Sequence, residues 1–498
     1  MAIVSAPTAL RRWEALDPDK PALTDDTITL SRRQLARRTN RLAREFAARG
    51  VTEGSFVTIA MPNRCACIEA AIAALKLGAT PQPVSSRLPK RELDAIVELA
   101  DPSLVFGVEA GSYPDRVTLP AGFEAAATTS DAPLPDRTAR HWKAPTSGGS
   151  TGRPKLIVAG TPAEVDDELQ PFQFPVLIPR DGVALIPGPL YHNAPFTTGL
   201  QNLFHGNHVV IMGRFDALAT LELIERHRVQ YVLLVPTMMS RIWKLPAAQR
   251  ARFDLSSLRV VYHMASHCPA WLKAAWIEWL GPERIFELYG GTEGQAITAL
   301  DGVEWLQHRG SVGRCVSGEI RILDEDGNEA PVGEVGEIYM RPTPDTGPTY
   351  FYVGAESRAR DGWETIGDIG WLDEEGYLYL ADRRTDMIVR GGANIYPAEV
   401  EAAIDEHPAV QSCAVIGLPD EDLGQRVHAI VQTAGGVSES ALARHLEERL
   451  AKYKIPGTYE FVSEPMRDDA GKTRRSALRE ARTAHPRLIG EGYIDGPC

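Results

Sequence analysis

The stretch Ser147-Gly148-Gly149-Ser150-Thr151-Gly152-Arg153-Pro154-Lys155 runs directly into the apolar residues Leu156-Ile157-Val158. Glycines let backbone N–H groups approach an anion, hydroxyls add hydrogen-bond donors, and Lys155 adds a mobile positive charge. A flexible linker is the ordinary reading of a Ser/Gly-rich run, but a loop that ends at an apolar strand has a fixed position. Arg153-Pro154 replaces the Lys-Ser/Thr of a Walker loop, and no Gly-x-Gly-x-x-Gly opens a helix here. The stretch therefore predicts a phosphate-binding loop of another kind.

Strand-like and helix-like segments alternate on both sides of this loop. Before it, the apolar spacing predicts a helix over Ser31–Ala48 and a buried strand over Ser55–Met61. A second helix at Cys67–Leu77 and a strand at Thr80–Val84 complete a parallel α/β pattern. After the loop, we expect strands at Val183–Ile186, Val209–Met212, Tyr231–Val235, Leu258–Tyr262 and Ile285–Leu288, and helices at Leu218–His227 and Ala270–Leu280.

The C-terminal part of the chain has a different pattern. Residues 311–342 consist of short strand-like runs separated by turn residues, which predicts a β-rich subdomain. Beyond a charged interruption at Asp382–Thr385, the pattern is helix, strand, strand, helix: Pro397–Glu406, Val410–Leu418, Arg426–Gln432 and Glu439–Leu450. We therefore predict an α/β protein with a large N-terminal domain, residues 1–384, and a small mobile α+β domain, residues 385–498.

The bulk composition excludes several classes of protein. Lys and Arg number 53 and Asp and Glu 66, a net charge of −13, which argues against a broad nucleic-acid surface. The N-terminus lacks the basic start and apolar core of a signal peptide, and no apolar run is long enough to span a bilayer. The cysteines do not have zinc-site spacing. We expect reduced thiols in a cytoplasmic protein.

Further short motifs follow the loop in a fixed order. They are Tyr289-Gly290-Gly291-Thr292-Glu293, Gly367-Asp368, Asp382-Arg383, Arg390-Gly391-Gly392 with its continuation to Glu401, and Arg467-Asp468-Asp469-Ala470-Gly471-Lys472. With the loop, this ordered set resembles the adenylate-forming superfamily of acyl- and aryl-CoA synthetases, peptide-synthetase adenylation domains and firefly-type luciferases. The resemblance covers residues 10–480. It is greatest for bacterial acyl-CoA ligases that act on bulky alicyclic acids, of bile-acid or terpenoid type, or on fatty acids.

The resemblance implies an acid–CoA ligase that uses ATP, Mg²⁺ and coenzyme A. The acid attacks the α-phosphorus and releases pyrophosphate, and the CoA thiol then attacks the acyl-adenylate and releases AMP. Lys472 would stabilise the charge that builds in the first step. Glu293 would bind the metal, and Thr292 a phosphate. The implied ATP and AMP contacts are Ser147, Gly149, Ser150, Thr151, Gly152, Lys155, Met264, Ala265, Ser266, Tyr289, Thr292, Asp368, Arg383 and Lys472.

Between the two steps the small domain of the family rotates. The hinge would be Thr385, where the family usually has Asp or Lys. Rotation would withdraw Lys472 and present Arg390, Gly391 and Gly392 to the pantetheine arm of CoA, where glycines allow close approach. A second departure is the segment Met264–His267, which usually reads Gly-Gly-Ala-Pro in the family.

The acid pocket is expected between His192 and Gly291. Peptide-synthetase domains place an Asp near its start to bind an ammonium group, whereas Pro189–Phe196 offers His192 and no carboxylate. That difference favours an acid without an α-amino group, and we hypothesise a bulky hydrophobic one. A satisfied core histidine is the ordinary alternative for His192. The expected pocket walls are His192, Phe196, Gly199, Pro236, Met238, Met264, Gly290 and Gly291.

Other functions remain open at this point. A free-standing adenylation enzyme would load a carrier-protein thiol instead of CoA. A luciferase-like oxygenase shares the fold, and a sensor of acyl-AMP or nucleotide would have lost the chemistry. Intact Glu293, Asp368, Arg383 and Lys472 argue against the sensor. The expected partners are the acid, ATP and CoA, with a carrier protein as the alternative to CoA, and no nucleic acid. The sequence does not distinguish a monomer from a homodimer.

Overall fold

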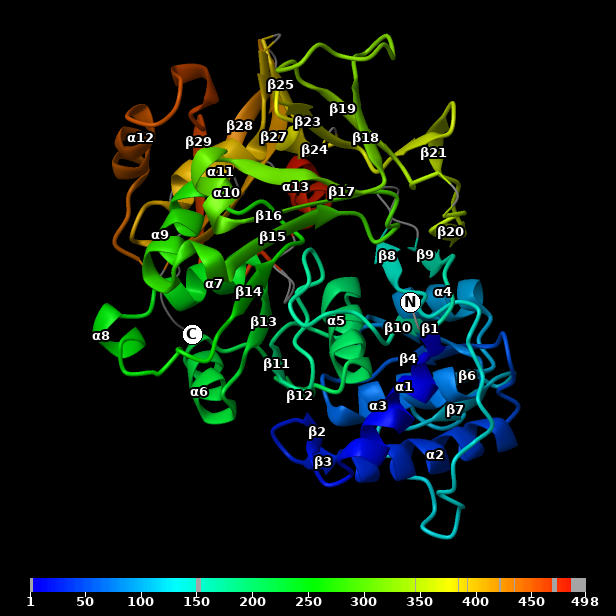
Figure 1. The fold of residues 1–498 in the computed structure, drawn as a ribbon. Coiled ribbons are helices and arrows are strands. Elements are labelled where there is room, and N and C mark those ends of the chain that lie inside the picture. Colours follow the sequence, from blue (N-terminus) through cyan, green and yellow to red (C-terminus); the bar gives the residue numbers. More distant parts are fainter. Residues whose placement is uncertain are drawn as a thin grey trace, which may run out of the picture.

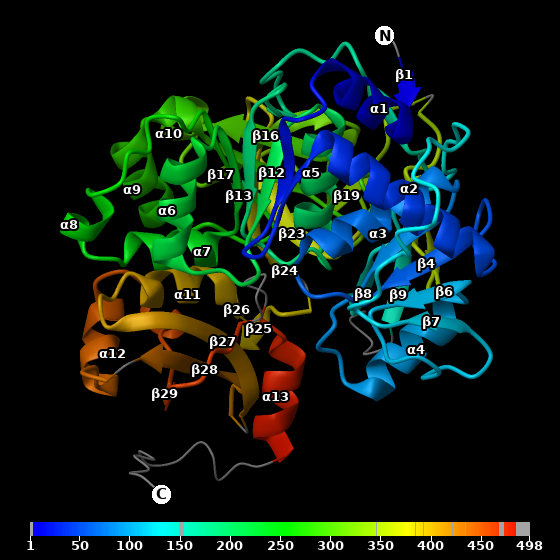
Figure 2. The ribbon, with the colours of Figure 1, turned by 90° about the horizontal axis from the view of Figure 1, so that it is seen from below.

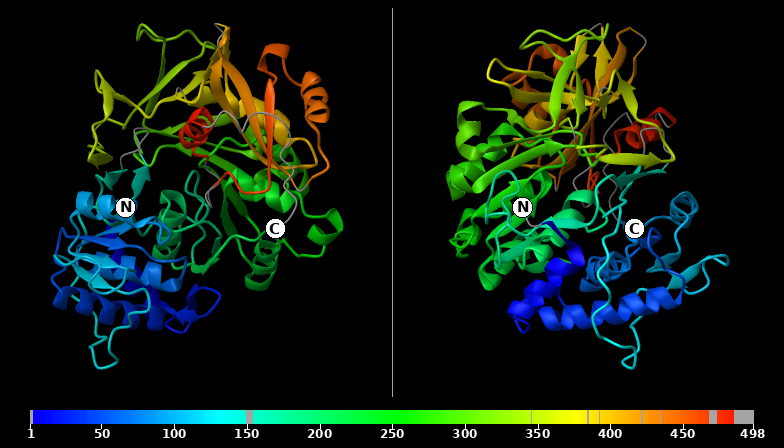
Figure 3. Two further views of the ribbon diagram at one scale, coloured as in Figure 1. Left: turned by 180° about the vertical axis from the view of Figure 1, so that it is seen from behind. Right: turned by 45° about the vertical axis from the view of Figure 1, so that its right-hand side comes forward.

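The computed structural model describes residues 3–148, 154–344, 346–383, 385–391, 393–420, 422–433, 435–467 and 473–484. Side chains of Ser147, Gly148 and Arg383 are outside this description. A large N-terminal domain occupies most of the molecule, and a small C-terminal domain lies against one side of it (Figures 1 and 2). Figure 3 shows the same division from two further directions. None of the helices in these residues is long and apolar enough to cross a membrane.

The first layer of the large domain is a parallel sheet with strand order β5-β4-β6-β7. Its strands are β4 (Phe56–Ile59), β5 (Thr80–Pro83), β6 (Leu104–Phe106) and β7 (Val117–Leu119), and its helices are α1 (Ala6–Leu16), α2 (Arg32–Ala48), α3 (Cys65–Lys76) and α4 (Lys90–Ala100). Ser31 starts α2 with a capping box, in which its hydroxyl accepts from the Gln34 N–H and its own N–H donates to the Gln34 side chain. Helix α1, helix α4 and strand β6 were not predicted.

A second, larger sheet runs through the centre of the molecule. Strands β2 (Pro21–Thr24), β12 (His208–Ile211), β11 (Val183–Ile186), β13 (Tyr231–Leu234), β14 (Val260–His263) and β15 (Ile285–Gly290) are parallel, and β3 (Thr29–Ser31) pairs with β2 at one edge. The predicted strand at Leu258 starts two residues later. The helices on this sheet are α5 (Asn193–Phe204), α6 (Ala217–His227), α7 (Pro236–Trp243), α8 (Ala247–Arg250), α9 (Ala270–Leu280) and α10 (Gly302–Gln307).

The predicted β-rich region continues this same sheet instead of forming a separate one. From β15 onward the strands are antiparallel, in the order β15-β16-β17-β24-β23-β19-β22-β21. They are β16 (Ile297–Asp301), β17 (Ser311–Ser317), β19 (Gly336–Arg341), β21 (Arg358–Arg360), β22 (Trp363–Thr365), β23 (Asp368–Leu372) and β24 (Tyr377–Arg383), with β18 (Glu319–Leu323) paired to β19. The continuous sheet brings β23 and β24 toward the carboxyl end of β15.

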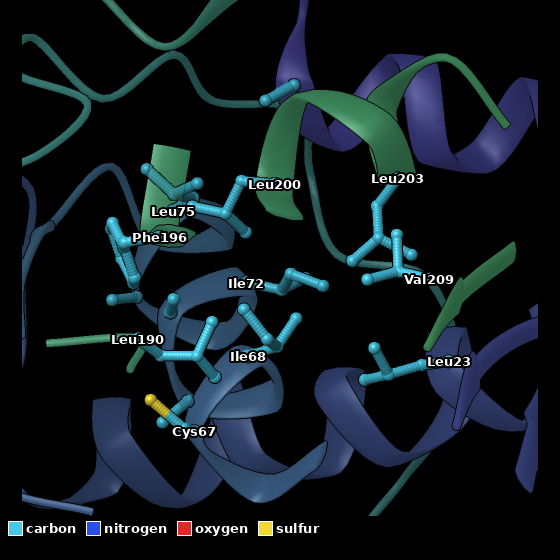
Figure 4. Close-up of a cluster of buried hydrophobic side chains, with 14 of the residues drawn as sticks. Leu23, Cys67, Ile68, Ile72, Leu75, Leu190, Phe196, Leu200, Leu203 and Val209 are labelled. Atoms are coloured by element: carbon cyan, nitrogen blue, oxygen red, sulfur yellow. The ribbon is translucent and has the colours of Figure 1, made fainter. Parts of the chain in front are cut away.

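The main core lies between the two sheets. Helices α3 and α5 face each other there, and α3 is apolar around almost its whole circumference, as a helix buried on all sides must be. Ile68, Ile72 and Leu75 of α3 meet Phe196 and Leu200 of α5 (Figure 4). This packing holds the start of α5 in place.

The small domain has its own core and a three-stranded sheet. Its elements are β25 (Ile388–Arg390), β26 (Ala393–Ile395), α11 (Pro397–Asp405), β27 (Val410–Asp420), β28 (Gly424–Thr433), α12 (Glu439–Glu447), β29 (Thr458–Val462) and α13 (Arg475–Ala484). Strand β29 and helix α13 were not predicted, because β29 spans only five residues and α13 is rich in charged residues, with Leu478 as its one large apolar side chain. Lys244, just past α7, donates to the Val410 carbonyl at 2.7 Å, which ties this domain to the large one.

Candidate active site

The phosphate-binding loop predicted from the sequence connects two strands of a small antiparallel sheet. Strands β8 (Thr146–Gly148) and β9 (Pro154–Ala159) pair with Thr146 opposite Leu156, and β20 (Tyr350–Val353) pairs with the other edge of β9. Gly149, Ser150, Thr151 and Gly152 lie outside the described residues, so their contacts with phosphate stay predictions. The described ends of the loop are close together, as a loop that encloses an anion requires.

Lys155 and Glu293 meet beside Tyr352. The Lys155 Nζ atom lies 3.7 Å from the centre of the Tyr352 ring and 3.9 Å from Glu293 Oε1. The Tyr352 hydroxyl donates to that same oxygen at 2.6 Å, and burial together with this carboxylate raises the Tyr352 pKa. Glu293 is only 7% exposed. A cation, a hydroxyl and a buried carboxylate, contributed by three separate segments, therefore surround one point next to the loop.

The chain packs closely around Gly290 and Gly291, just before Glu293. A Cβ atom on Gly291 would lie 2.8 Å from Glu293 Oε2, and one on Gly290 would lie 3.0 Å from the Ala296 carbonyl oxygen. The carboxylate thus folds back over the chain just after β15, with Thr292 directly before it. Gly290 and Gly291 were predicted as pocket walls. Neighbouring atoms also lie close to both, so a side chain at either position would displace them.

A lone carboxylate fits the way proteins hold Mg²⁺ that arrives with a nucleotide. Such a metal takes one or two carboxylates, and the substrate phosphates and water complete its coordination. Over the described ranges, no group of three or more His, Cys, Asp or Glu side chains is placed to hold a metal without a nucleotide. Glu293 is the residue that would hold the ion, and the ion would offset the repulsion between ATP and the carboxylate substrate.

Tyr289, Asp368 and Arg383 come together although they are far apart in the sequence. The Tyr289 hydroxyl donates to Asp368 Oδ2 at 2.8 Å, and Asp368 is buried at the start of β23. Asp368 and Arg383 are register partners in β23 and β24. An aromatic ring and a carboxylate in contact are the groups that a nucleoside needs for stacking and for binding of its ribose hydroxyls.

The segment Met264–Ser266 directly follows β14, the strand that pairs with β15. Ala265 has a φ of 78°, in the left-handed region that disfavours any residue with a Cβ atom. Glycine adopts this φ without a steric penalty, so the side chain of Ala265 strains the backbone here. The strained alanine stands at the position expected beside adenine.

A buried ion pair joins α9 to β15 close to Tyr289. Lys273 of α9 donates from Nζ to Glu287 Oε2 at 2.6 Å, and the Nδ1 atom of His263 lies 3.8 Å from Glu287 Oε1. Burial lowers the His263 pKa to about 4, so its imidazole is neutral at pH 7. Burial also opposes ionisation of Glu287, yet the Lys273 ammonium holds its pKa below the usual range. Glu287 and His263 lie two residues before Tyr289 and Ala265.

A second lysine, not predicted from the sequence, lies at the start of α5. Lys143 is 9% exposed and donates to the side-chain oxygen of Asn193, the first residue of α5. Burial lowers its pKa to about 8, and Glu293 acts in the opposite direction. His192 is the residue before Asn193 and occupies the N-cap position of α5, without a capping hydrogen bond from its side chain. Its position among Trp142, Ala144 and Pro145, just before the loop, is the sequence feature that could have identified it as a buried lysine.

The predicted walls of the acid pocket lie on several elements, among them α5, α7 and the end of β14. Phe196 is fully buried in the core, and a Cβ atom on Gly199 would lie 3.9 Å from Ile68 and Leu190. Pro236 and Met238 are buried in α7, whereas Met264 is half-buried at the end of β14. Their role as pocket walls stays a prediction.

The residues expected to serve CoA make their observed contacts within the small domain. Arg390 donates to the Tyr453 carbonyl at 2.7 Å, and the Gly391 N–H donates to the Leu423 carbonyl at 2.8 Å. Gly391 has a φ of 55°, which suits glycine. Gly392 and Lys472 lie outside the described residues. Thr385, the expected hinge, accepts from Arg479 at 3.4 Å through its carbonyl.

Two family models match the chain. The model described as AMP-binding enzyme matches residues 10–351, and the model described as AMP-binding enzyme C-terminal domain matches residues 399–472. Residues 352–398 lie between these ranges, so the boundary at 384/385 stays a prediction.

Full-length relatives agree with these matches. A feruloyl-CoA synthase from Amycolatopsis sp. is 32% identical over 486 residues, which cover 94% of this chain and 97% of the relative. A 2-succinylbenzoate–CoA ligase from Geobacillus kaustophilus is 32% identical over 487 residues, 96% of this chain and 98% of the relative.

A solved structure agrees as well. The o-succinylbenzoate CoA synthetase of Bacillus subtilis, in complex with ATP and magnesium, has 26% identity and a TM-score of 0.77 over 96% of this chain and 100% of that chain. The same enzyme with its acyl-adenylate intermediate has a TM-score of 0.80.

Proposed function

This chain belongs to the AMP-binding enzyme family, as a ligase that joins a carboxylic acid to a thiol through an acyl-adenylate, and we propose that its acid is bulky and hydrophobic and has no α-amino group. ATP, Mg²⁺ and CoA are its co-substrates and cofactor. The hydrogen bond from Tyr289 to Asp368, at 2.8 Å, is the main structural observation in support of a nucleotide site.

The choice of acid rests on what surrounds the start of α5. Helix α5 starts after His192, and Lys143 donates to Asn193 there, while the stretch Pro189–Phe196 contains no carboxylate that could hold an ammonium group. A buried cation attracts the carboxylate of a substrate and repels an ammonium group. The relatives named for feruloyl and 2-succinylbenzoate groups are not named for amino acids either.

We assign the site residues as the family motifs imply. Lys472 stabilises the charge that develops as the acid attacks the α-phosphorus, Glu293 binds Mg²⁺, and Thr292 binds phosphate. Rotation about Thr385 then exchanges Lys472 for the segment at Arg390–Gly392, along which the pantetheine arm enters. Free CoA is the proposed acceptor, and the protein is cytoplasmic. A carrier-protein thiol is the alternative acceptor.

The substrate is tested by acid-dependent exchange of labelled pyrophosphate into ATP. The panel contains amino, aryl, fatty and polycyclic acids, followed by CoA and mass spectrometry of the products. Exchange with polycyclic or other bulky hydrophobic acids is expected. Exchange with amino acids alone would refute the substrate class, and thioester formation only on a holo-carrier protein would refute CoA as the acceptor.

The assignment of Lys472 has its own test. The substitution Lys472→Ala is expected to abolish pyrophosphate exchange and to spare thioester formation from supplied acyl-AMP. Wild-type rates of exchange in this variant would contradict the assigned role.

A further inference from the structure

A buried carboxylate in the small domain holds two arginines at once. Glu401 of α11 is 5% exposed and accepts from Arg467 Nη2 at 3.1 Å. It also accepts from Arg475 Nη2 at 2.9 Å on each of its two oxygens and from the Val415 N–H at 2.9 Å. Burial alone would raise the pKa of Glu401, but the two guanidinium groups lower it below the usual range. Glu401 is therefore ionised and fully engaged.

The two arginines flank the segment to which Lys472 belongs. Arg467 precedes residues 468–472 and Arg475 follows them, while a β-bridge joins Arg467 to Thr473. The described ends of this segment are thus fastened to one carboxylate, and they are fastened at a fixed separation. Charge-assisted bidentate hydrogen bonds are the strongest and most directional polar contacts available for such a task.

The second of these arginines also reaches the expected hinge. Arg475 Nη1 donates to Asp386 Oδ2 at 2.8 Å, and Asp386 directly follows Thr385. One turn further along α13, Arg479 contacts the Thr385 carbonyl. Through Arg475, the hinge end, helix α11 and the ends of the lysine segment are joined into one body.

We propose that Glu401 is a positioning residue, which sets the place of Lys472 for adenylation by holding Arg467 and Arg475. The inference rests on the proposed role of Lys472. Helix α11 itself does not depend on the Glu401 charge, because Val400 and Ile404 on the same helix are fully buried in the core of the small domain. Loss of the charge therefore weakens the contacts that hold Arg467 and Arg475, while the contacts of β26 and Gly391 do not involve Glu401.

The predicted effect is a separation of the two half-reactions. The substitution Glu401→Gln keeps the shape and removes the charge, and we expect it to slow acid-dependent pyrophosphate exchange by about 100-fold, as misplacement of a reacting group by roughly 1 Å does. Thioester formation from supplied acyl-AMP and CoA should stay within about threefold of wild type, since it does not use Lys472. A residue that only supports folding would slow both reactions equally.

The matched control is Glu460, another carboxylate of the small domain. It accepts from Arg482 of the same helix α13 at 2.6 and 2.7 Å, but it contacts neither end of the lysine segment. Glu460→Gln should leave the ratio of the two half-reactions unchanged. A second variant, Arg475→Lys, keeps a cation near Glu401 but cannot reach Glu401 and Asp386 together, and it should reproduce the separation if Glu401→Gln does not fold.

The outcomes distinguish this inference from the assignment on which it rests. If Lys472→Ala does not impair pyrophosphate exchange, the assigned role of Lys472 is overturned. If Lys472→Ala does impair exchange, but Glu401→Gln and Arg475→Lys slow both half-reactions equally or slow neither, the positioning role of Glu401 is overturned. Slow exchange with near-normal thioester formation supports it.

Discussion

Removal of Lys273 would leave the carboxylate of Glu287 buried without its cation. The two groups are 2.6 Å apart, both are almost inaccessible to solvent, and the neutral ring of His263 lies 3.8 Å from the other oxygen. The substitution Lys273→Met keeps the length of the side chain and removes the charge. No other cation is described in contact with Glu287, so the carboxylate must accept a proton or remain charged in an apolar surrounding.

The loss of stability in this variant is set by whichever of these two outcomes costs less free energy. Protonation of a glutamate with an ordinary pKa of about 4.3 costs about 4 kcal/mol at pH 7. Leaving it charged would forfeit an attraction of roughly 6 kcal/mol at an effective dielectric constant of about 20. The variant should therefore lose about 3–4 kcal/mol of stability, which is also the range seen when one member of a buried pair is removed.

The sign of the pH dependence follows from the same reasoning. In the wild type the Glu287 pKa is lowered, so its contribution to stability is present above the ordinary pKa and is lost as pH falls. In Lys273→Met the pKa is raised, so the variant is penalised more as pH increases. The difference between the two proteins should shrink from about 4 kcal/mol at pH 7 to about 1 kcal/mol at pH 5.

The assay is urea denaturation at 25 °C, followed by tryptophan fluorescence of the large domain at both pH values. Replacement of the whole pair, Lys273→Met with Glu287→Leu, is the control and should recover most of the loss, since an apolar pair of similar volume often replaces a buried ion pair without cost. A loss below about 1 kcal/mol that does not change with pH would refute the buried pair. The KM for ATP should rise in Lys273→Met, because Tyr289 follows on the same strand.

Other positions give independent tests. Replacement of Ala265 by glycine should relieve its positive φ and raise stability by about 1 kcal/mol in urea denaturation; a destabilised variant would contradict the strain. Tyr352→Phe should raise the Mg²⁺ concentration needed for half-maximal pyrophosphate exchange by about tenfold, because the hydroxyl orients Glu293. Tighter Mg²⁺ binding would show instead that the hydroxyl competes with the metal. Burial opposes ionisation of Glu460, but His428 and Arg482 lower its pKa to about 2, so the stability that Glu460 adds to the small domain should be complete above pH 5 and nearly absent at pH 2. Equal urea midpoints of wild type and Glu460→Gln at pH 5 would refute that contribution.

The sequence by itself determined the family, the order of the motifs and most of the central strands. Apolar periodicity is local, so it located the helices at Ser31–Ala48 and Ala270–Leu280 and the parallel strands between residues 183 and 288. It did not locate β29 or α13, whose burial comes from contacts with distant parts of the small domain. The continuation of the parallel sheet into residues 297–383 also depended on pairing between strands far apart in the chain.

Only the tertiary structure decided which groups act together. Tyr289 and Asp368 are 79 residues apart, and Glu401 and Arg475 are 74 apart, so no local pattern connects them. Lys143 was not singled out in the sequence, and only the packing of α5 places Asn193 beside it. A motif names the chemical groups that a phosphate, a ribose or a carboxylate needs. The order of strands in a sheet, and the burial that removes water from these groups, determine which of them meet and how strongly they interact.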